Sequence, residues 1–499
     1  MRCRRLAACS AALAALAVPA AAHGAASPLP PDFVGVNAAK GDVLQTGVRR
    51  LKVLDDIAAT RIQVVRVPFD WSLVEREPGK ADLSWTDGLV SEAALRGVRV
   101  LPILGDPPAW RSPRPDGVAR KIIYPPKSNQ EMAYFAAFMA ARYGTGGSFW
   151  SSHPDLPQLP IRAWQIWNEP NIPIFWGQQP NAAEYTAMLK AVGSAIRQVQ
   201  PDAEIVTAGL TFSPLGTPAP EFLEEMYRAG AKGSFDTLAV HPYSHDDRTV
   251  VALIGDARAV LDAHGDRAPI WVTEFGWATG DPSRLHFRTE QQQADLIGQT
   301  VRRLGLMREQ LGLRGFDYFY WAETAQDPTV EDTFWAHVGL LTYGDRRKPG
   351  YFAFRDMAAA LLDGRLVPYP GPYVPDPLRI RNLKVSPSAF VPARWAGVAT
   401  RRPSHGRAGR RGGGRLSFRA DRTGRVLLTI ERKRRGRRVR VGSARLTVYE
   451  GLNRVLLSGS VRRRALPPGR YVVRVRDVAG IGGVATTSFR IVKHRPRRR

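Results

Sequence analysis

The chain has 499 residues, of which 44% are hydrophobic and 23% are charged. This length excludes a single ordinary domain, and the composition is that of a globular protein with a large core. The formal net charge of +27 is unevenly placed, because residues 371–499 hold 34 Lys and Arg against 5 Asp and Glu. A strongly basic C-terminal part therefore follows a nearly neutral body.

Residues 1–26 have the pattern of a signal peptide. MRCRR is a cationic start, LAACSAALAALAV is a short apolar run, and AAAHGAAS offers cleavage sites after Ala22 or Ala26. The apolar run is too short to span a bilayer and no later run is longer, so no transmembrane segment is expected. Both cysteines, Cys3 and Cys9, lie in this leader. The mature, secreted protein is therefore expected to have neither disulfides nor cysteine metal ligands.

From residue 30 to 366, short β-branched or aromatic runs alternate with helix-like stretches. Eight strands are expected, over 33–38, 62–69, 98–105, 161–168, 204–211, 235–243, 270–277 and 316–322. Helical periodicity is found over 129–144, 182–200, 289–305 and 348–364. Eight strand–helix units predict an α/β fold of the (β/α)₈ TIM barrel type. An open doubly wound sheet is the main alternative, but no G-x-G-x-x-G turn follows the first strand, which disfavours its dinucleotide-binding form.

The C-terminal part has a different pattern. Residues 367–377, VPYPGPYVPDP, are expected to be a proline-rich linker. Over 378–494, alternating runs such as RVLLTIER and RYVVRVRD are separated by Gly and Pro turns and predict a small, basic β-sandwich. Residues 495–499 are expected to be a disordered basic tail.

The arginines of this basic domain admit more than one interpretation. Their alternation with apolar residues suits the solvent face of a half-buried sheet. Attachment to anionic cell-envelope polymers or acidic glycans is the functional alternative. Nucleic acid is disfavoured, because export is expected and no nucleic-acid-binding motif is present.

Two of the predicted strands end in a glutamate. AWQIWNEPN (163–171) places Glu169 at the tip of the fourth strand, and WVTEFGW (271–277) places Glu274 at the tip of the seventh. Because the C-terminal ends of barrel strands build the reaction site, both acids are expected to face one crater. Two facing carboxylates suit the hydrolysis of glycosidic bonds, where one donates a proton and the other attacks. Helix capping or ion pairing at strand ends is the structural alternative.

IWNEPN and VTEFGW resemble the acid/base and nucleophile motifs of the retaining clan A glycoside hydrolases, of which the cellulase-like family 5 and the family 39 type are the most similar. The likeness covers residues 30–365 and implies the (β/α)₈ fold. It implies that Glu169 is the acid/base, that Glu274 is the nucleophile, and that Asn168 hydrogen-bonds the sugar 2-hydroxyl. GDPPAW at 105–110 stands where family 5 enzymes usually have a histidine, which favours a family 39-like or a divergent subgroup. The C-terminal domain resembles Ig- or fibronectin-like modules of secreted enzymes.

The same resemblance implies roles for four further residues. Arg66, in RVPFDW, would hold the nucleophile ionised. His241 and Tyr243, in HPY, would line the sugar subsite, with the tyrosine bonded to the nucleophile. Trp321 would form a flat platform for a sugar ring. A structural ion pair, a structural histidine and plain core packing are the respective alternatives for Arg66, His241 and Trp321.

These patterns together predict a secreted retaining β-glycoside hydrolase that acts by double displacement on a β-linked poly- or oligosaccharide, with no metal and no organic cofactor. Its expected location is extracellular, with association to the cell wall as an option. The alternative is a non-catalytic carbohydrate-binding or cell-surface adhesion protein on the same barrel.

Overall fold

The structure is a computed structural model that describes residues 28–38, 48–118, 122–177, 179–280, 287–324, 334–366, 379–392, 399–400, 413–420, 424–434, 437–448, 451–461, 464–477 and 484–493. The predicted leader (1–26), linker (367–377) and basic tail (495–499) lie outside these residues. No helix in the described part of the chain is both long and apolar enough to cross a membrane.

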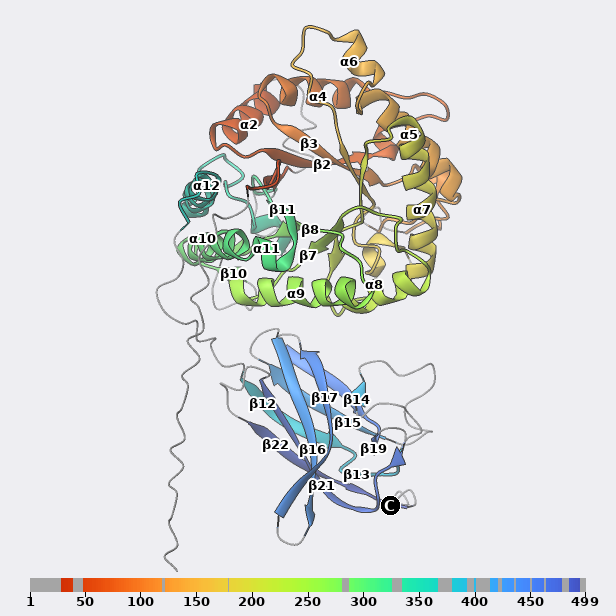
Figure 1. Cartoon of the computed structure of the whole chain (residues 1–499), viewed down its shortest axis with the longest axis vertical. Coiled ribbons are helices and arrows are strands. Elements are labelled where there is room, and N and C mark those ends of the chain that lie inside the picture. Colours follow the sequence, from red (N-terminus) through yellow and green to blue (C-terminus); the bar gives the residue numbers. More distant parts are fainter. Residues whose placement is uncertain are drawn as a thin grey trace, which may run out of the picture.

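Parallel strands form a closed barrel in the first part of the chain (Figure 1). The strands are β1 (Val34–Asn37), β2 (Val64–Asp70), β3 (Arg99–Gly105), β4 (Ala163–Ile166), β5 (Glu204–Val206), β6 (Leu210–Thr211), β7 (Leu238–His241), β8 (Ile270–Phe275) and β11 (Leu313–Tyr318). β5 pairs with β4 and β6 pairs with β7, so these two short strands share the fifth position and close the circle. The predicted (β/α)₈ barrel is confirmed.

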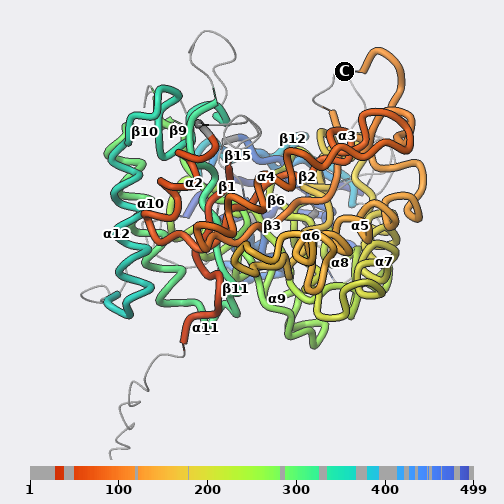
Figure 2. The backbone as a smooth tube through the Cα atoms, turned by 90° about the horizontal axis from the view of Figure 1, so that it is seen from above, coloured from red at the N-terminus to blue at the C-terminus, as the bar shows by residue number. Residues whose placement is uncertain are grey.

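Helices surround the strands on the outside. The longer ones are α2 (Val48–Ala59), α4 (Ser84–Leu95), α5 (Asn129–Tyr143), α7 (Ala182–Val199), α8 (Ala219–Arg228), α9 (Asp247–Ala263), α10 (Glu290–Leu306) and α12 (Pro349–Leu362). Short helices are α3 (Trp71–Val74), α6 (Ser148–Ser152), α11 (Arg308–Leu311), η1 (Ala109–Arg111), η2 (Pro173–Phe175) and η3 (Phe334–His337). Figure 2 shows α10 and α12 on one side of the barrel and α5 and α7 on the other. Local sequence sets several helix starts, such as the Thr289–Gln292 capping box of α10.

The inward-facing side chains of the strands form two layers of different polarity. Because side chains alternate along a strand, every second residue faces the barrel interior. The lower layer is apolar and consists of Val64, Leu101, Ala163, Val206, Ala239 and Trp271. Two residues further along four of these strands come Arg66, Gln165, His241 and Thr273, all buried. A polar layer therefore lies directly above an apolar one, toward the C-terminal ends of the strands.

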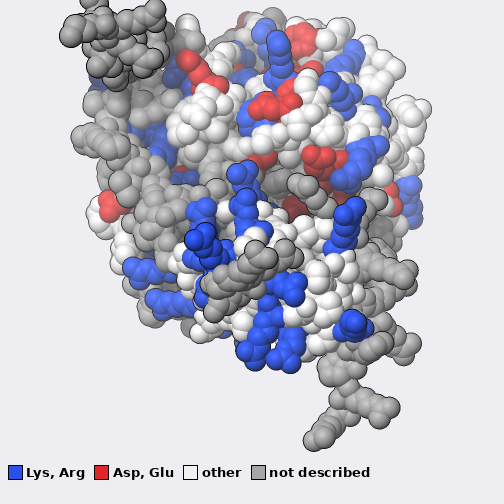
Figure 3. Space-filling model, turned by 60° about the horizontal axis from the view of Figure 1, so that its bottom comes forward, with Lys and Arg blue, Asp and Glu red and all other residues white. Residues whose placement is uncertain are grey.

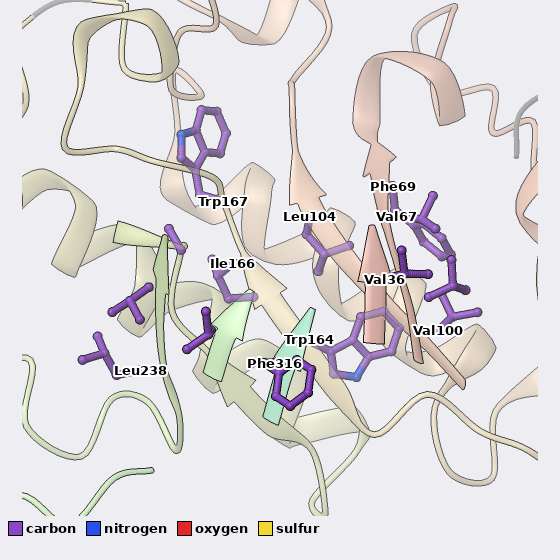
Figure 4. Close-up of a cluster of buried hydrophobic side chains, with 14 of the residues drawn as sticks. Val36, Val67, Phe69, Val100, Leu104, Trp164, Ile166, Trp167, Leu238 and Phe316 are labelled. Carbon is purple, nitrogen blue, oxygen red and sulfur yellow. The ribbon is translucent and has the colours of Figure 1, made fainter. Parts of the chain in front are cut away.

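The outward-facing side chains form the main core, between the strands and the helices. Figure 4 shows part of it, with Val67 from β2, Ile166 from β4 and Phe316 from β11 among the labelled residues. All three are fully buried. This packing fixes the strands from outside, so the inward side chains are held on a rigid frame.

The C-terminal part folds as two sheets around a core of its own. One sheet has the order β12 (Ile380–Ser386), β15 (Gly414–Ala420), β18 (Gly451–Leu457) and β14 (Ala399–Thr400). The other has the order β13 (Ala389–Phe390), β22 (Ala485–Ile491), β21 (Gly469–Asp477), β16 (Gly424–Arg434) and β17 (Arg437–Val448). Two-stranded ribbons are formed by β9 (Ala278–Thr279) with β10 (Phe287–Arg288), in the barrel part, and by β19 (Ser460–Val461) with β20 (Arg464–Ala465). Leu416, Leu428 and Phe489 belong to one buried cluster to which both sheets contribute.

Candidate active site

The two predicted catalytic glutamates lie together at the C-terminal end of the barrel. Glu274 is the fifth residue of β8, and Glu169 follows β4 by three residues. A carboxylate oxygen of one lies within 4.8 Å of a carboxylate oxygen of the other. Each side chain is buried but keeps 6% of its residue surface exposed, whereas His241 beside them has none. The acids are thus the outermost members of the polar layer.

Arg66 is the central cation of this layer. It is 1% exposed, and its guanidinium Nη1 donates to Glu274 Oε1 at 2.7 Å. The other donors reach Asn37 Oδ1 (2.6 Å), Gln165 Oε1 (2.6 Å) and Asn168 Oδ1 (2.9 Å). Only the planar fork of an arginine can serve so many acceptors on different strand ends at once. The predicted contact between Arg66 and Glu274 is therefore present, and Asn168 is oriented by the same group.

The surroundings of the two acids differ, which separates their proton affinities. Burial raises the pKa of Glu274, but the Arg66 guanidinium and the hydroxyl of Tyr243, which donates to Glu274 Oε2 at 2.9 Å, lower it. Burial and the charge of Glu274 both raise the pKa of Glu169 well above its ordinary value, and only Arg66 opposes them. The shared proton is therefore expected on Glu169, with Glu274 ionised.

His241 is the direct side-chain partner of Glu169. Its Nδ1 lies 2.7 Å from Glu169 Oε1, and its Nε2 lies 3.0 Å from Thr273 Oγ1. Burial and the nearby Arg66 lower the pKa of His241 well below its ordinary value, so the imidazole is neutral. Gly209, between β5 and β6, makes room for the ring, since a Cβ there would lie 1.9 Å from His241 Nε2. The histidine thus orients the acid without adding a charge.

The backbone that carries Glu169 is strained. Trp167 has φ 74° and Glu169 has φ 42°, a left-handed region that costs non-glycine residues about 1–3 kcal/mol each. Neighbouring contacts hold this turn: Trp167 Nε1 donates to Phe175 O at 2.7 Å. The buried Asn171 amide donates to Thr211 O at 2.6 Å, which ties the turn to the end of β6. Such strain is typical of positions that a function fixes.

Aromatic side chains form a wall beside Glu274. Tyr243 contacts Trp335 edge-on with ring centroids 5.0 Å apart, and Phe319 and Phe334 complete the group. Trp335 is 48% exposed and offers an open face. Trp321, which the sequence pattern favoured as the sugar platform, is 1% exposed and packs edge-on against Tyr351. That burial is at odds with a platform role, which requires an open ring, and matches the core-packing alternative.

A third carboxyl lies inside the barrel. Asp317 of β11 is fully buried, and neither of its oxygens has a well-aligned hydrogen-bond partner among the described residues. Burial raises the pKa of Asp317 to about 7, although Arg66 lowers it. Gly35 on the neighbouring strand leaves space for this side chain, because a Cβ there would lie 1.9 Å from Asp317 Oδ1.

Glu169, His241 and Glu274 together offer three ligand atoms within 4.8 Å of one another, which is a spacing that a metal ion can use. Their chemistry suits a cation poorly, however. Arg66 already places a buried positive charge 2.7 Å from Glu274 Oε1, and Tyr243 occupies Oε2. A divalent ion would have to displace or repel the guanidinium. The expectation that no metal is needed stays a prediction.

Several members of the site were not predicted from the sequence. Asn37, Gln165 and Thr273 hold the predicted residues in place through the hydrogen bonds of Arg66 and His241. Strand alternation could have indicated two of them, because Gln165 and Thr273 each follow an inward-facing apolar residue of the same strand by two positions. Trp335 belongs to no motif and is recognised by its exposure.

Comparison with known proteins finds a family model that matches part of the barrel. Residues 158–341, which contain both glutamates, match the family model described as "Glycosyl hydrolase catalytic core". No curated protein matches the chain. Among solved structures, a family 39 glycoside hydrolase from Bacteroides cellulosilyticus WH2 is 18% identical, with 86% of this chain and 81% of that chain covered and a TM-score of 0.50. A glucosidase from Croceicoccus marinus is 12% identical, with 86% and 96% covered and a TM-score of 0.50. These two likenesses show a shared fold.

Proposed function

We propose that this glycoside hydrolase core cleaves a β-linked poly- or oligosaccharide with retention of anomeric configuration. The observation that carries the proposal is the separation of the two carboxylates. Oxygens within 4.8 Å of one another leave no room for a water molecule between the sugar and the second acid, as an inverting enzyme needs. Direct attack by that acid on the anomeric carbon is the reaction that suits this spacing.

In the first step, an oxygen of Glu274 forms a bond to the anomeric carbon while the glycosidic C–O bond breaks. Glu169 gives its proton to the departing oxygen, so the leaving group departs as an alcohol. Arg66 and Tyr243 keep Glu274 ionised before attack. The raised pKa of Glu169 keeps its proton available near neutral pH.

In the second step, Glu169 acts as a base. It is now a carboxylate and takes a proton from water, whose oxygen bonds to the anomeric carbon as the ester bond to Glu274 breaks. Consumption of the Glu274 charge in the first step removes one cause of the raised pKa of Glu169, so its proton affinity falls when a base is required. The two inversions give net retention.

Side chains beside Glu169 and Glu274 offer groups that can contact a sugar. Asn168 Oδ1 accepts from Arg66, so its amide Nδ2 is the end that suits a sugar hydroxyl such as the 2-hydroxyl. The open face of Trp335 complements the apolar face of a sugar ring. We also propose that the protein is exported, which the leader pattern of residues 1–26 supports.

The test is turnover of a panel of aryl β-glycosides by the wild type, Glu169→Ala and Glu274→Ala. With azide added, Glu274→Ala is expected to yield an α-glycosyl azide and Glu169→Ala a β-glycosyl azide, each identified by NMR. The azide replaces the missing carboxylate in the first case and attacks the glycosyl-enzyme in the second. Glu75→Gln is the matched control, because Glu75 is also a buried acid but pairs with Arg111 instead.

Two results would overturn the proposal. One is full turnover by both alanine variants. The other is hydrolysis with inversion by the wild type, which would assign Glu274 as a base. A wild-type protein that binds glycans without turnover of any glycoside would support the adhesion alternative.

A further inference from the structure

We propose that the outer face of the sheet β12–β15–β18 in the C-terminal domain binds an acidic polysaccharide. Five cationic side chains stand on this face: Arg381, Lys384, Arg415, Arg419 and Arg454, all exposed. We call these five residues the cationic face. The proposal goes beyond the glycosidase function and depends on no residue of the barrel.

Strand register places these cations side by side. Arg381 of β12 is directly opposite Arg419 of β15. Lys384 and Arg454 flank Ser417 from either side, on β12 and β18. Arg415 lies two residues from Ser417 on the same strand. At about 3.3 Å per residue, the four-residue span of β15 from Arg415 to Arg419 is about 13 Å.

The direction of these side chains follows from the burial of their neighbours. Leu416, Phe418 and Val455 belong to the buried core between the sheets, so the residues that alternate with them point outward. The cations therefore project from the strands of one sheet rather than from a loop.

No acid neutralises this face in the described part of the domain. The acids described there are Glu431 and Asp477, and both belong to the other sheet. Like charges opposite one another destabilise a strand pair, so the face keeps an arrangement that costs folding free energy. A polyanion would remove that repulsion. Figure 3 shows the same bias on a larger scale, with Lys and Arg gathered over the lower part of the view and no Asp or Glu visible there.

The chemistry of the face favours a polysaccharide. Arginine forks pair with carboxylates and sulfates of successive sugars in a bidentate manner. Single-stranded nucleic acid needs aromatic side chains on which bases stack. The uncharged residues beside these cations include Ser386, Ser417, Leu452 and Leu456, which offer no such ring. The barrel on the same chain carries a glycosyl hydrolase catalytic core, so glycans are its expected environment.

The experiment measures binding of the full chain to polygalacturonate at several salt concentrations. The variant Arg415→Gln/Arg419→Gln/Arg454→Gln is compared with Arg445→Gln/Arg470→Gln/Arg490→Gln, three exposed arginines on the opposite sheet. Both variants lose the same charge. We expect the first to weaken binding at least tenfold and to lower the slope of log Kd against log salt by about 2–3. The second should change Kd less than threefold.

Other outcomes would overturn the proposal. Equal weakening by both variants would mean that only net charge matters. No binding of wild type at 0.15 M salt, or tighter binding of duplex DNA than of polygalacturonate, would reject the polysaccharide as occupant. The triple Arg→Lys variant of the same three positions, which keeps the charge but loses the bidentate fork, is expected to bind more weakly than wild type and more tightly than the triple Arg→Gln variant. Thermal unfolding and near-UV circular dichroism that match those of the wild type check that the C-terminal domain of each variant is folded.

Discussion

Removal of the Tyr243 hydroxyl is the most direct test of how the nucleophile is kept ionised. Tyr243→Phe deletes one oxygen, which donates to Glu274 Oε2 at 2.9 Å. The ring and its edge-on contacts with Trp335 and Phe319 are retained. The variant therefore isolates a single hydrogen bond to a buried carboxylate.

The size of the effect follows from that bond. A hydrogen bond to a charged group contributes about 1.5–3 kcal/mol, and about 1.4 kcal/mol corresponds to a pKa change of 1. Because the hydroxyl lowers the pKa of Glu274, its loss is expected to raise that pKa by about 1 to 2. The Arg66 ion pair stays, so Glu274 is still ionised at high pH.

The assay is the pH dependence of kcat/KM for an aryl β-glycoside. The acid limb of the profile reports ionisation of Glu274 in the free enzyme, so it should move to higher pH by about 1 to 2 pH units. At pH values on this limb, kcat/KM should be lower than in the wild type by roughly 10- to 100-fold. Tyr227→Phe is the matched control, because Tyr227 also donates to a carboxylate, Asp266 Oδ2 at 2.8 Å, but lies on α8, outside the site. An acid limb that stays in place in Tyr243→Phe, or that moves equally in Tyr227→Phe, would refute the reasoning.

Three further variants test other parts of the barrel. Gly209→Ala places a Cβ 1.9 Å from the His241 ring and should lower kcat/KM about 100-fold, because the displaced ring no longer orients Glu169. Gly193→Ala is the control, since its Cβ would meet its nearest neighbour at 3.5 Å and should leave activity unchanged. Equal activity of the two variants would contradict this prediction. Asp317 keeps its proton to about pH 7 in the folded protein but ionises near 3.8 when unfolded, so the free energy of unfolding should fall as pH rises from about 4 to 7. The free energy of unfolding of Asp317→Asn, measured in urea, should not fall over this pH range. If the variant and the wild type show the same pH dependence of stability, the Asp317 carboxyl does not hold the proton. Lys348→Met removes the buried ammonium group that pairs with the part-buried Glu323 and should destabilise the fold by about 1.5–3 kcal/mol in urea unfolding, with a loss below about 1 kcal/mol counting against the pair.

The barrel and its pair of acids could be predicted because they depend on local, periodic signals. Strand-length apolar runs and helical stretches alternate eight times, and Glu169 and Glu274 each interrupt such a run at its C-terminal end. The sequence pattern predicts the last strand over 316–322, whereas the strand spans Leu313–Tyr318. Pairing of Leu313 with Ile270 of β8 extends it at its start, a tertiary contact that no local pattern contains.

The supporting residues could not be predicted in the same way. Asn37 and Gln165 acquire their importance from Arg66, which is remote from both in sequence. Asn37 is paired with Arg66 on the neighbouring strand and Gln165 lies two strands away, so both contacts exist only once the strands are assembled. The role of Trp321 cannot be read from the sequence for a related reason. An aromatic residue at a strand tip suits either a platform or the core, and only packing against Tyr351 decides between them.

The divided fifth strand gives the two acids unequal mechanical support. Glu274 stands in β8, which is paired on both sides by β7 and β11. The turn that carries Glu169 adjoins the gap between β5 and β6, where single bridges such as Asn168 with Gly209 replace a continuous ladder. We therefore expect the position of Glu169 to depend on side-chain contacts such as that of Asn171 with Thr211, whereas strand pairing itself holds Glu274. In the proposed mechanism, loss of those contacts would misplace the proton donor and leave the attacking carboxylate in position.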